Sequence, residues 1–139
     1  MLNYFNLDYL KVTSILYKEH KESPERIRIK LDDLIVNSNR KKAQLNSVIQ
    51  LVFPGDEISE ISFSSQFSLS DSELIQALKS RNKEKASEAV ALLFTYIYPF
   101  IRENVWTILK DTRNPVRLPM IDCRWLDLND GVELRRNKE

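Results

Sequence analysis

The chain has 139 residues, of which 21 are Lys or Arg and 20 are Asp or Glu, for a formal net charge of +1. The length fits one domain, and a content of 42% hydrophobic and 29% charged residues is ordinary for a globular protein. A charge this close to zero argues against a general attraction to nucleic acid or to an anionic membrane. The lone Cys123 cannot form an internal disulfide, and the first residues lack the basic start and apolar run of an export signal. We therefore expect a single cytoplasmic domain over residues 1–139.

The first half of the chain, about residues 9–69, is patterned for strands. Tyr9–Tyr17 is rich in residues that favour strands, and Arg26–Leu31 alternates strictly between polar and apolar residues. Asp32 and Asp33 interrupt this alternation before Leu34 resumes it, which predicts a β-bulge that re-aims the strand.

Two more strands follow, joined by the strongest turn signal in the chain. In the first, Ala43–Phe53, Val48 and Val52 add apolar residues to the otherwise polar side, so we expect both of its faces to be partly covered. Pro54–Asp56 then predicts a tight turn, because proline presets φ and Gly55 tolerates a positive φ. The fourth strand, Ile61–Leu69, alternates large apolar residues with serine and glutamine.

A helical part is expected over about residues 71–112. Ser70 or Asp71, followed by Glu73, predicts the start of a short amphipathic helix. The basic residues between Lys79 and Lys85 are not interleaved with aromatic residues, so we interpret them as a solvated connector and not as a nucleic-acid site. Apolar residues at intervals of three and four then predict a long buried helix over 86–112.

This long helix has more apolar faces than one sheet can cover. Ala89 to Ile101 contains no charge, but the stretch is shorter than the roughly 18 residues that span a bilayer, which favours protein contact. Pro99 should kink the helix or mark the start of a new segment. Arg102 and Glu103 are expected to cap the buried helix or to pair at its edge. The apolar residues on its other faces are Leu92, Phe94, Tyr96, Tyr98, Phe100 and Trp106.

The C-terminal part is expected to be extended. Pro115 and Pro119 each push the preceding residue out of the helical region, which predicts an extended arm over residues 113–128. After Gly131 the chain is mostly polar, so we expect residues 129–139 to form a frayed tail.

Residues that carry enzymatic chemistry are scarce. The chain has 2 glycines, too few for a dinucleotide fingerprint or a phosphate-cradling loop. His20 lies in a polar segment and is expected at the surface, and a zinc site would need residues from another subunit. The acid pairs Asp32 with Asp33 and Asp127 with Asp130 lack a third ligand or a partner acid. We expect no enzyme, no cofactor and no metal site.

Two motifs resemble the SecB export chaperone family. The helix contains the run Tyr98 to Glu103, of the family type aromatic, proline, aromatic, then Arg and Glu, and the arm from Pro115 to Asp122 is of the proline-rich family type. A weaker likeness runs upstream through Phe67–Leu69, so the resemblance covers the chain from about Tyr9 to Leu126. The motif residues are Tyr98, Pro99, Arg102, Glu103, Pro119 and Asp122.

The resemblance implies an α+β fold with a four-stranded antiparallel sheet and a long C-terminal helix packed on it. It also implies an oligomer, a homotetramer built as a dimer of dimers with helices between the sheets. SecB proteins are holdases that keep unfolded polypeptides in apolar grooves without ATP or metal. By position, the implied peptide-binding groove would be lined by Phe63, Phe67, Leu69, Tyr96, Phe100, Trp106, Leu118, Met120 and Trp125.

Two functions from different classes remain open on the sequence. The first is a SecB-like holdase for unfolded clients, in protein export or beside a toxin and antitoxin pair. The second is a dedicated adaptor of the same fold that binds one specific protein partner. SecB proteins are acidic and that charge helps to dock the SecA motor, whereas this chain is neutral, so the resemblance does not extend to SecA docking.

Overall fold

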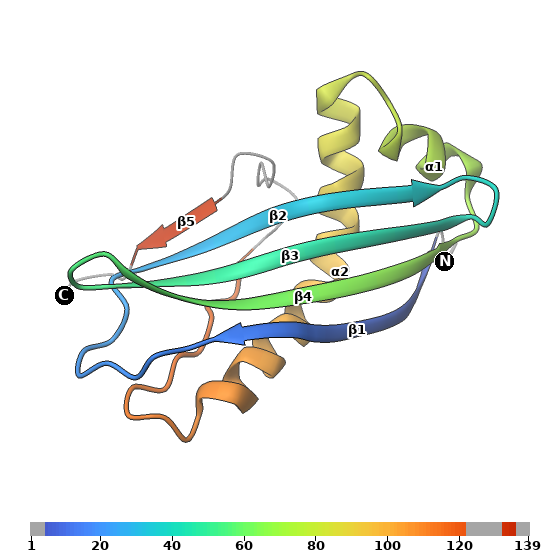
Figure 1. The fold of residues 1–139 in the computed structure, drawn as a ribbon. Coiled ribbons are helices and arrows are strands. Elements are labelled where there is room, and N and C mark those ends of the chain that lie inside the picture. Colours follow the sequence, from blue (N-terminus) through green and yellow to red (C-terminus); the bar gives the residue numbers. More distant parts are fainter. Residues whose placement is uncertain (1–4, 122–131, 136–139) are drawn as a thin grey trace.

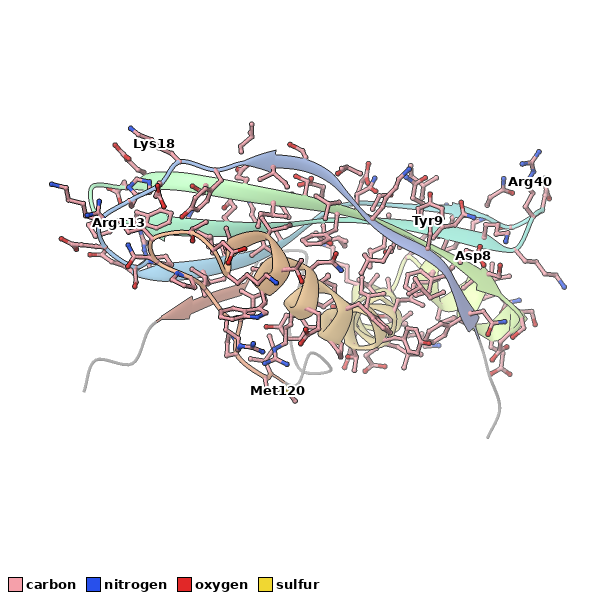
Figure 2. The ribbon with its side chains drawn as sticks, turned by 90° about the horizontal axis from the view of Figure 1, so that it is seen from below. Asp8, Tyr9, Lys18, Arg40, Arg113 and Met120 are labelled. Carbon is pink, nitrogen blue, oxygen red and sulfur yellow. The ribbon has the colours of Figure 1, made fainter. Side chains whose placement is uncertain are left out.

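A computed structural model describes residues 5–121 and, for the backbone, residues 132–135. These residues form one antiparallel sheet of five strands and two helices, an α+β fold in two layers with both helices on the same side of the sheet (Figures 1 and 2). The elements are β1 (Phe5–Leu16), β2 (Arg26–Asn37), β3 (Lys42–Phe53), β4 (Glu57–Leu69), α1 (Ser72–Leu78), α2 (Lys83–Leu109) and β5 (Val132–Arg135).

The strand order β1-β4-β3-β2-β5 puts β3 and β4 in the centre of the sheet. The predicted turn between them is confirmed: Gly55 has φ 84°, Asp56 has φ 61°, and the Asp56 N–H donates to the Phe53 carbonyl over 3.1 Å. The predicted bulge in β2 is confirmed by a register shift between Leu31 and Asp33.

The edge strand β1 is irregular as well. Its pairing with β4 shifts register between Leu7 and Tyr9 and again between Val12 and Ser14. Each shift places an extra residue in β1 opposite its partner strand, which bends the strand and increases its twist.

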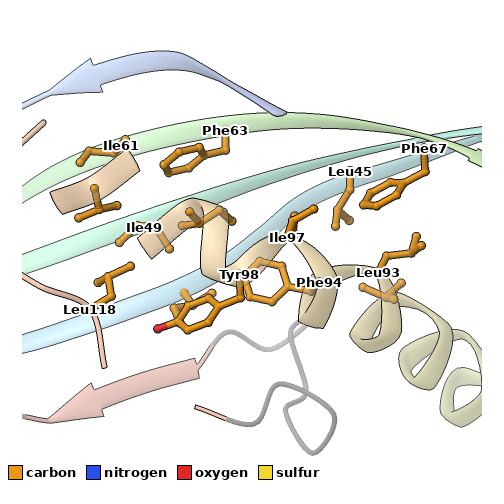
Figure 3. Close-up of a cluster of buried hydrophobic side chains, with 14 of the residues drawn as sticks. Leu45, Ile49, Ile61, Phe63, Phe67, Leu93, Phe94, Ile97, Tyr98 and Leu118 are labelled. Carbon is orange, nitrogen blue, oxygen red and sulfur yellow. The ribbon is translucent and has the colours of Figure 1, made fainter. Parts of the chain in front are cut away.

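The core lies between the sheet and α2. Every second residue of β3 and β4 points towards the helix, and this face holds the large aliphatic and aromatic side chains, as period-two patterning requires. The outer-face residues Val48 and Val52 are also buried, so β3 is covered on both faces, as predicted. Figure 3 shows part of the core, whose members include Leu45, Ile49, Ile61, Phe63, Phe67, Leu93, Phe94, Ile97, Tyr98 and Leu118.

Both helices begin at side-chain caps. The Asp71 carboxylate accepts from the Glu73 N–H over 2.8 Å, which confirms the predicted start of α1. The Asn82 side chain caps α2 in the same way, and α2 ends three residues earlier than expected, at Leu109. Pro99 lies inside α2 and has no N–H to donate, and the helix changes direction along its length (Figure 1).

The tail departs from expectation. We expected residues 129–139 to be frayed, but the backbone of Val132–Arg135 forms β5, which pairs antiparallel with Arg26–Ile29 of β2. Four residues give too short a pattern for a strand prediction. These residues form a strand because they pair with the edge of β2, whose N–H and C=O groups on that side would otherwise have no strand partner.

The outer face of the sheet carries a polar network around Asp8. Its carboxylate accepts from Lys42 Nζ over 2.8 Å, from Gln66 Nε2 over 3.0 Å and from the Ser68 hydroxyl over 2.7 Å. The hydrogen bond from Lys42, followed by those from Gln66 and Ser68, lowers the pKa of Asp8 from 3.8 to about 2. The network ties β1 to β3 and β4.

The arm (residues 113–128) is described as far as Ile121, and residues 115–121 lie against α2 in no helix or strand. The Tyr98 hydroxyl donates to the Pro119 carbonyl over 2.7 Å, and Arg102 Nε donates to the Leu118 carbonyl over 2.9 Å. Leu118 itself is fully buried in the core. These contacts fasten the arm across the second half of α2.

The Asp8 network makes stability depend on pH in a defined window. Because the pKa of Asp8 is lowered on folding, its stabilisation is complete above the ordinary value of 3.8 and is lost as the pH falls towards about 2. We expect Asp8→Asn to lower the free energy of unfolding at pH 7 by up to about 1 kcal/mol, since the pair is partly exposed. Urea unfolding should show this difference vanishing near pH 2. A difference that stays constant over that range would contradict the assignment.

The fastening of the arm predicts a graded loss of stability. Tyr98→Phe removes one hydroxyl donor and should lower the free energy of unfolding by about 1 kcal/mol, while Arg102→Leu should lower it by about 2 kcal/mol. Glu103→Gln is the control, because Glu103 lies 4.0 Å from Arg117 in an exposed pair and should change stability by less than about 0.5 kcal/mol. Urea denaturation followed by circular dichroism measures all three.

Candidate functional site: an apolar stripe on the outer side of α2

Three large apolar residues are exposed along one flank of α2. Leu92, Tyr96 and Phe100 are 41%, 48% and 47% exposed. Their spacing of four residues aligns them along one line of the helix, and we call this set the α2 stripe. A contiguous row of this kind on a helix surface is typical of a contact surface, because isolated exposed apolar residues are scattered.

Aromatic contacts tie the α2 stripe to the core. The Phe5 ring lies edge-on to Tyr96, with 5.4 Å between the ring centroids, and edge-on to Phe67, with 5.5 Å. The ring of Phe100 follows at 6.0 Å from Tyr96. Rings arranged in this way present large apolar area with little conformational freedom to lose on binding.

The structure divides the nine residues predicted to line a groove. Phe63, Phe67, Leu69 and Leu118 are at most 2% exposed and belong to the core beneath α2. Tyr96 and Phe100 lie on the α2 stripe. The other three predicted residues are Met120, Trp106 and Trp125. Met120 is 79% exposed and lies at the periphery of the molecule (Figure 2), where its sulfur accepts from Arg102 Nη1 over 2.8 Å. Trp106 is partly exposed, and Trp125 lies outside the described residues.

Several of the motif residues contact the arm. Tyr98 and Arg102 hold its carbonyls, and Glu103 lies near Arg117, whose guanidinium stacks over the Trp106 ring at 4.2 Å. The expected role for Arg102 and Glu103, pairing at the edge of the helix, agrees with this placement, although the carbonyl of the arm is the main partner of Arg102. Two further motif residues are Pro99, exposed on α2, and Pro119, whose carbonyl accepts from Tyr98, while Asp122 lies outside the described residues.

Two residues at this surface, Leu92 and Phe5, are not predicted from the sequence. Leu92 is an apolar residue outside the main apolar face of the predicted helix. Its spacing of four residues from Tyr96 is the one sequence signal that places it on the α2 stripe. Phe5 lay before the predicted start of the first strand, and β1 in fact begins there. Its pairing opposite Leu69, next to the core, could not be read from the sequence.

His20 is less exposed than expected. Its side chain is 15% exposed and its ring stacks on Phe53 at 3.9 Å, while Nδ1 lies 3.4 Å from Glu57. The His20 carbonyl accepts from the Asn114 side chain over 2.7 Å, so this residue links the loop after β1 to the start of the arm. The residues next to His20 in the sequence are polar and predict an exposed side chain. The ring of Phe53, which belongs to β3, covers it instead.

The outer face of the sheet holds a shallow polar hollow of about 450 Å³ between β1 and β2. Its side chains satisfy one another: Gln44 donates to Ser64 over 3.2 Å, and Asn46 donates to the Asp33 carboxylate. Within the described ranges, no group of three or more His, Cys, Asp or Glu residues could hold a metal ion. Neither described helix is long and apolar enough to cross a membrane.

Comparison with known proteins finds similarity in structure. No family model and no curated protein matches the sequence. The SecB-like chaperone Rv1957 of Mycobacterium tuberculosis, solved with a ChAD peptide from the antitoxin HigA1 (Rv1956), has a TM-score of 0.56 and 14% sequence identity, over 84% of this chain and 89% of that one. A protein of unknown function from Streptococcus agalactiae has a TM-score of 0.41 and 13% identity, over 84% and 97% of the two chains.

Because the two sequences are only 14% identical, the similarity to the chaperone is a similarity of fold. The shared elements are the four long antiparallel strands and the long helix that follows them, which are also the elements that the sequence predicts. This chain therefore has a SecB-like fold.

Proposed function

We propose that this protein is an ATP-independent holdase that binds extended, apolar segments of unfolded polypeptides. The observation that carries the proposal is the α2 stripe, a row of exposed apolar side chains on a helix whose inner side is already filled by the core. The SecB-like fold supports it, because the similar structure from M. tuberculosis is a chaperone with a peptide bound.

Burial of apolar surface supplies the binding free energy. Each square ångström of apolar area removed from water contributes roughly 25 cal/mol, so a client segment of about ten or more residues laid along the α2 stripe gains from several side chains at once. No nucleotide is needed in such a cycle, since the client is released by dissociation and refolding.

The same stripe is proposed to contact sister copies of the chain. In a dimer of dimers with helices between the sheets, part of each α2 is covered by another α2, and clients occupy the remainder. We propose a homotetramer in the cytoplasm, and SecA docking is not part of the proposal because the chain lacks a net acidic charge.

The holdase proposal is tested by suppression of aggregation. The purified protein, without ATP, should suppress light scattering by an unfolded model protein and bind it with micromolar affinity or better. Tyr96→Ser combined with Phe100→Ser should weaken client binding at least tenfold, because both apolar contacts are lost, with little change in thermal stability since both residues are about half exposed.

Thr107→Ala is the control, because Thr107 is an exposed polar residue on the same face of α2, seven residues after Phe100. Its client affinity should equal that of the unmodified chain. Light scattering coupled to size exclusion, run on each variant, reports whether the oligomer persists. A purified chain that protects no client and binds no unfolded protein would overturn the holdase proposal.

The alternative proposal, a dedicated adaptor for one protein partner, makes a different prediction for a pull-down from the native host. The holdase should recover many unrelated proteins at low stoichiometry. A single partner recovered at fixed stoichiometry, with no suppression of aggregation, would favour the adaptor.

A further inference from the structure

The arm lies in a site whose donors recognise main-chain carbonyls. Arg102 Nε donates to the Leu118 carbonyl over 2.9 Å, and the Tyr98 hydroxyl donates to the next carbonyl, that of Pro119, over 2.7 Å. Both donors come from α2. Because every residue of a polypeptide has a carbonyl, two donors placed in this way would hold a segment of almost any sequence that adopts the backbone conformation of the arm.

Below these donors the core accepts alternate side chains of the arm. Val116 is 7% exposed and Leu118 is 0% exposed, whereas Arg117 between them turns outward over the Trp106 ring. Alternate residues of an extended chain point to the same side, so the site has one socket for residue i and one for residue i+2. Figure 3 shows Leu118 among the core side chains that form its socket.

The arm is anchored at its start, independently of the sockets. The Arg113 N–H donates to the Glu19 carboxylate and the Asn114 side chain donates to the His20 carbonyl, each over 2.7 Å. Residues 115–121 belong to no strand, so they can leave the site without breaking a sheet ladder. An extended segment of another chain can therefore take the place of residues 116–119 while the anchor stays in place.

We propose that the site formed by Tyr98, Arg102 and the two sockets is a binding site for extended client segments, and that the arm fills it as an intramolecular substitute. A client with apolar residues at positions i and i+2 displaces residues 116–119. The inference rests on the proposed holdase function and deepens it, because it gives a client a second contact surface on the same helix. Tyr98 and Arg102 each lie two residues from Phe100, so the sockets are on a different side of α2 from the α2 stripe.

The test uses a fluorescein-labelled peptide with the sequence of residues 113–121 and the full chain, measured by fluorescence anisotropy. Leu118→Ser weakens the resident arm and vacates its socket, so the variant should bind the peptide at least tenfold more tightly than the unmodified chain. Adding Tyr98→Phe to this variant should reverse most of the gain. Leu78→Ser is the matched control, because it also removes a buried leucine, but from α1, and should change peptide affinity by less than twofold.

A folded Leu118→Ser chain with no gain in affinity, or an equal gain for Leu78→Ser, would overturn the inference. Methyl NMR of the unmodified chain gives a readout that needs no variant to fold. Excess peptide should move the Val116 and Leu118 methyl signals from buried to solvent-exposed positions. Methyl signals that stay in place at millimolar peptide would overturn the inference.

The aggregation assay keeps this inference separate from the holdase proposal. One outcome is that the chain suppresses aggregation while the Val116 and Leu118 methyl signals stay in place on addition of the peptide. This result identifies a holdase that binds clients on the α2 stripe alone. A chain that neither suppresses aggregation nor binds the peptide fails both.

Discussion

The structure depends on how α2 is covered. A helix with apolar residues around most of its circumference cannot satisfy them against one sheet, because a sheet covers only one side of it. Its inner side, with Leu93, Ile97 and Ile101, packs on β3 and β4 and is fully buried. The remaining sides of α2 are not covered by the sheet. One of them is covered by the arm, and another is the α2 stripe.

The arm covers one of those sides. It contributes Leu118 to the core and is held through its carbonyls by Tyr98 and Arg102, so the most distinctive sequence motif of the chain acts between α2 and the arm. The α2 stripe is the side that stays exposed. Core, arm and stripe thus share one helix, which makes α2 both the main structural element and the main candidate for binding.

The fold was largely predictable because its signals are local. Period-two alternation, the turn at Pro54–Asp56 and the cap at Asp71 each depend on a few neighbouring residues. The candidate site was harder to predict, because burial depends on tertiary packing. Phe67 and Tyr96 are both aromatic residues in amphipathic elements, yet one is 0% and the other 48% exposed. The short strand β5 depends on the edge of β2, and its own sequence carries no comparable signal.

The two register shifts in β1 have a consequence for the behaviour of the protein towards itself. A strand at the end of a sheet offers hydrogen-bonding groups along its length, and a straight one recruits further strands without limit. The offsets at Leu7 to Tyr9 and at Val12 to Ser14 interrupt that row, so no long uniform template is available for fibril growth. An edge strand that is interrupted in this way is a poor template for the addition of further strands, from this chain or from another.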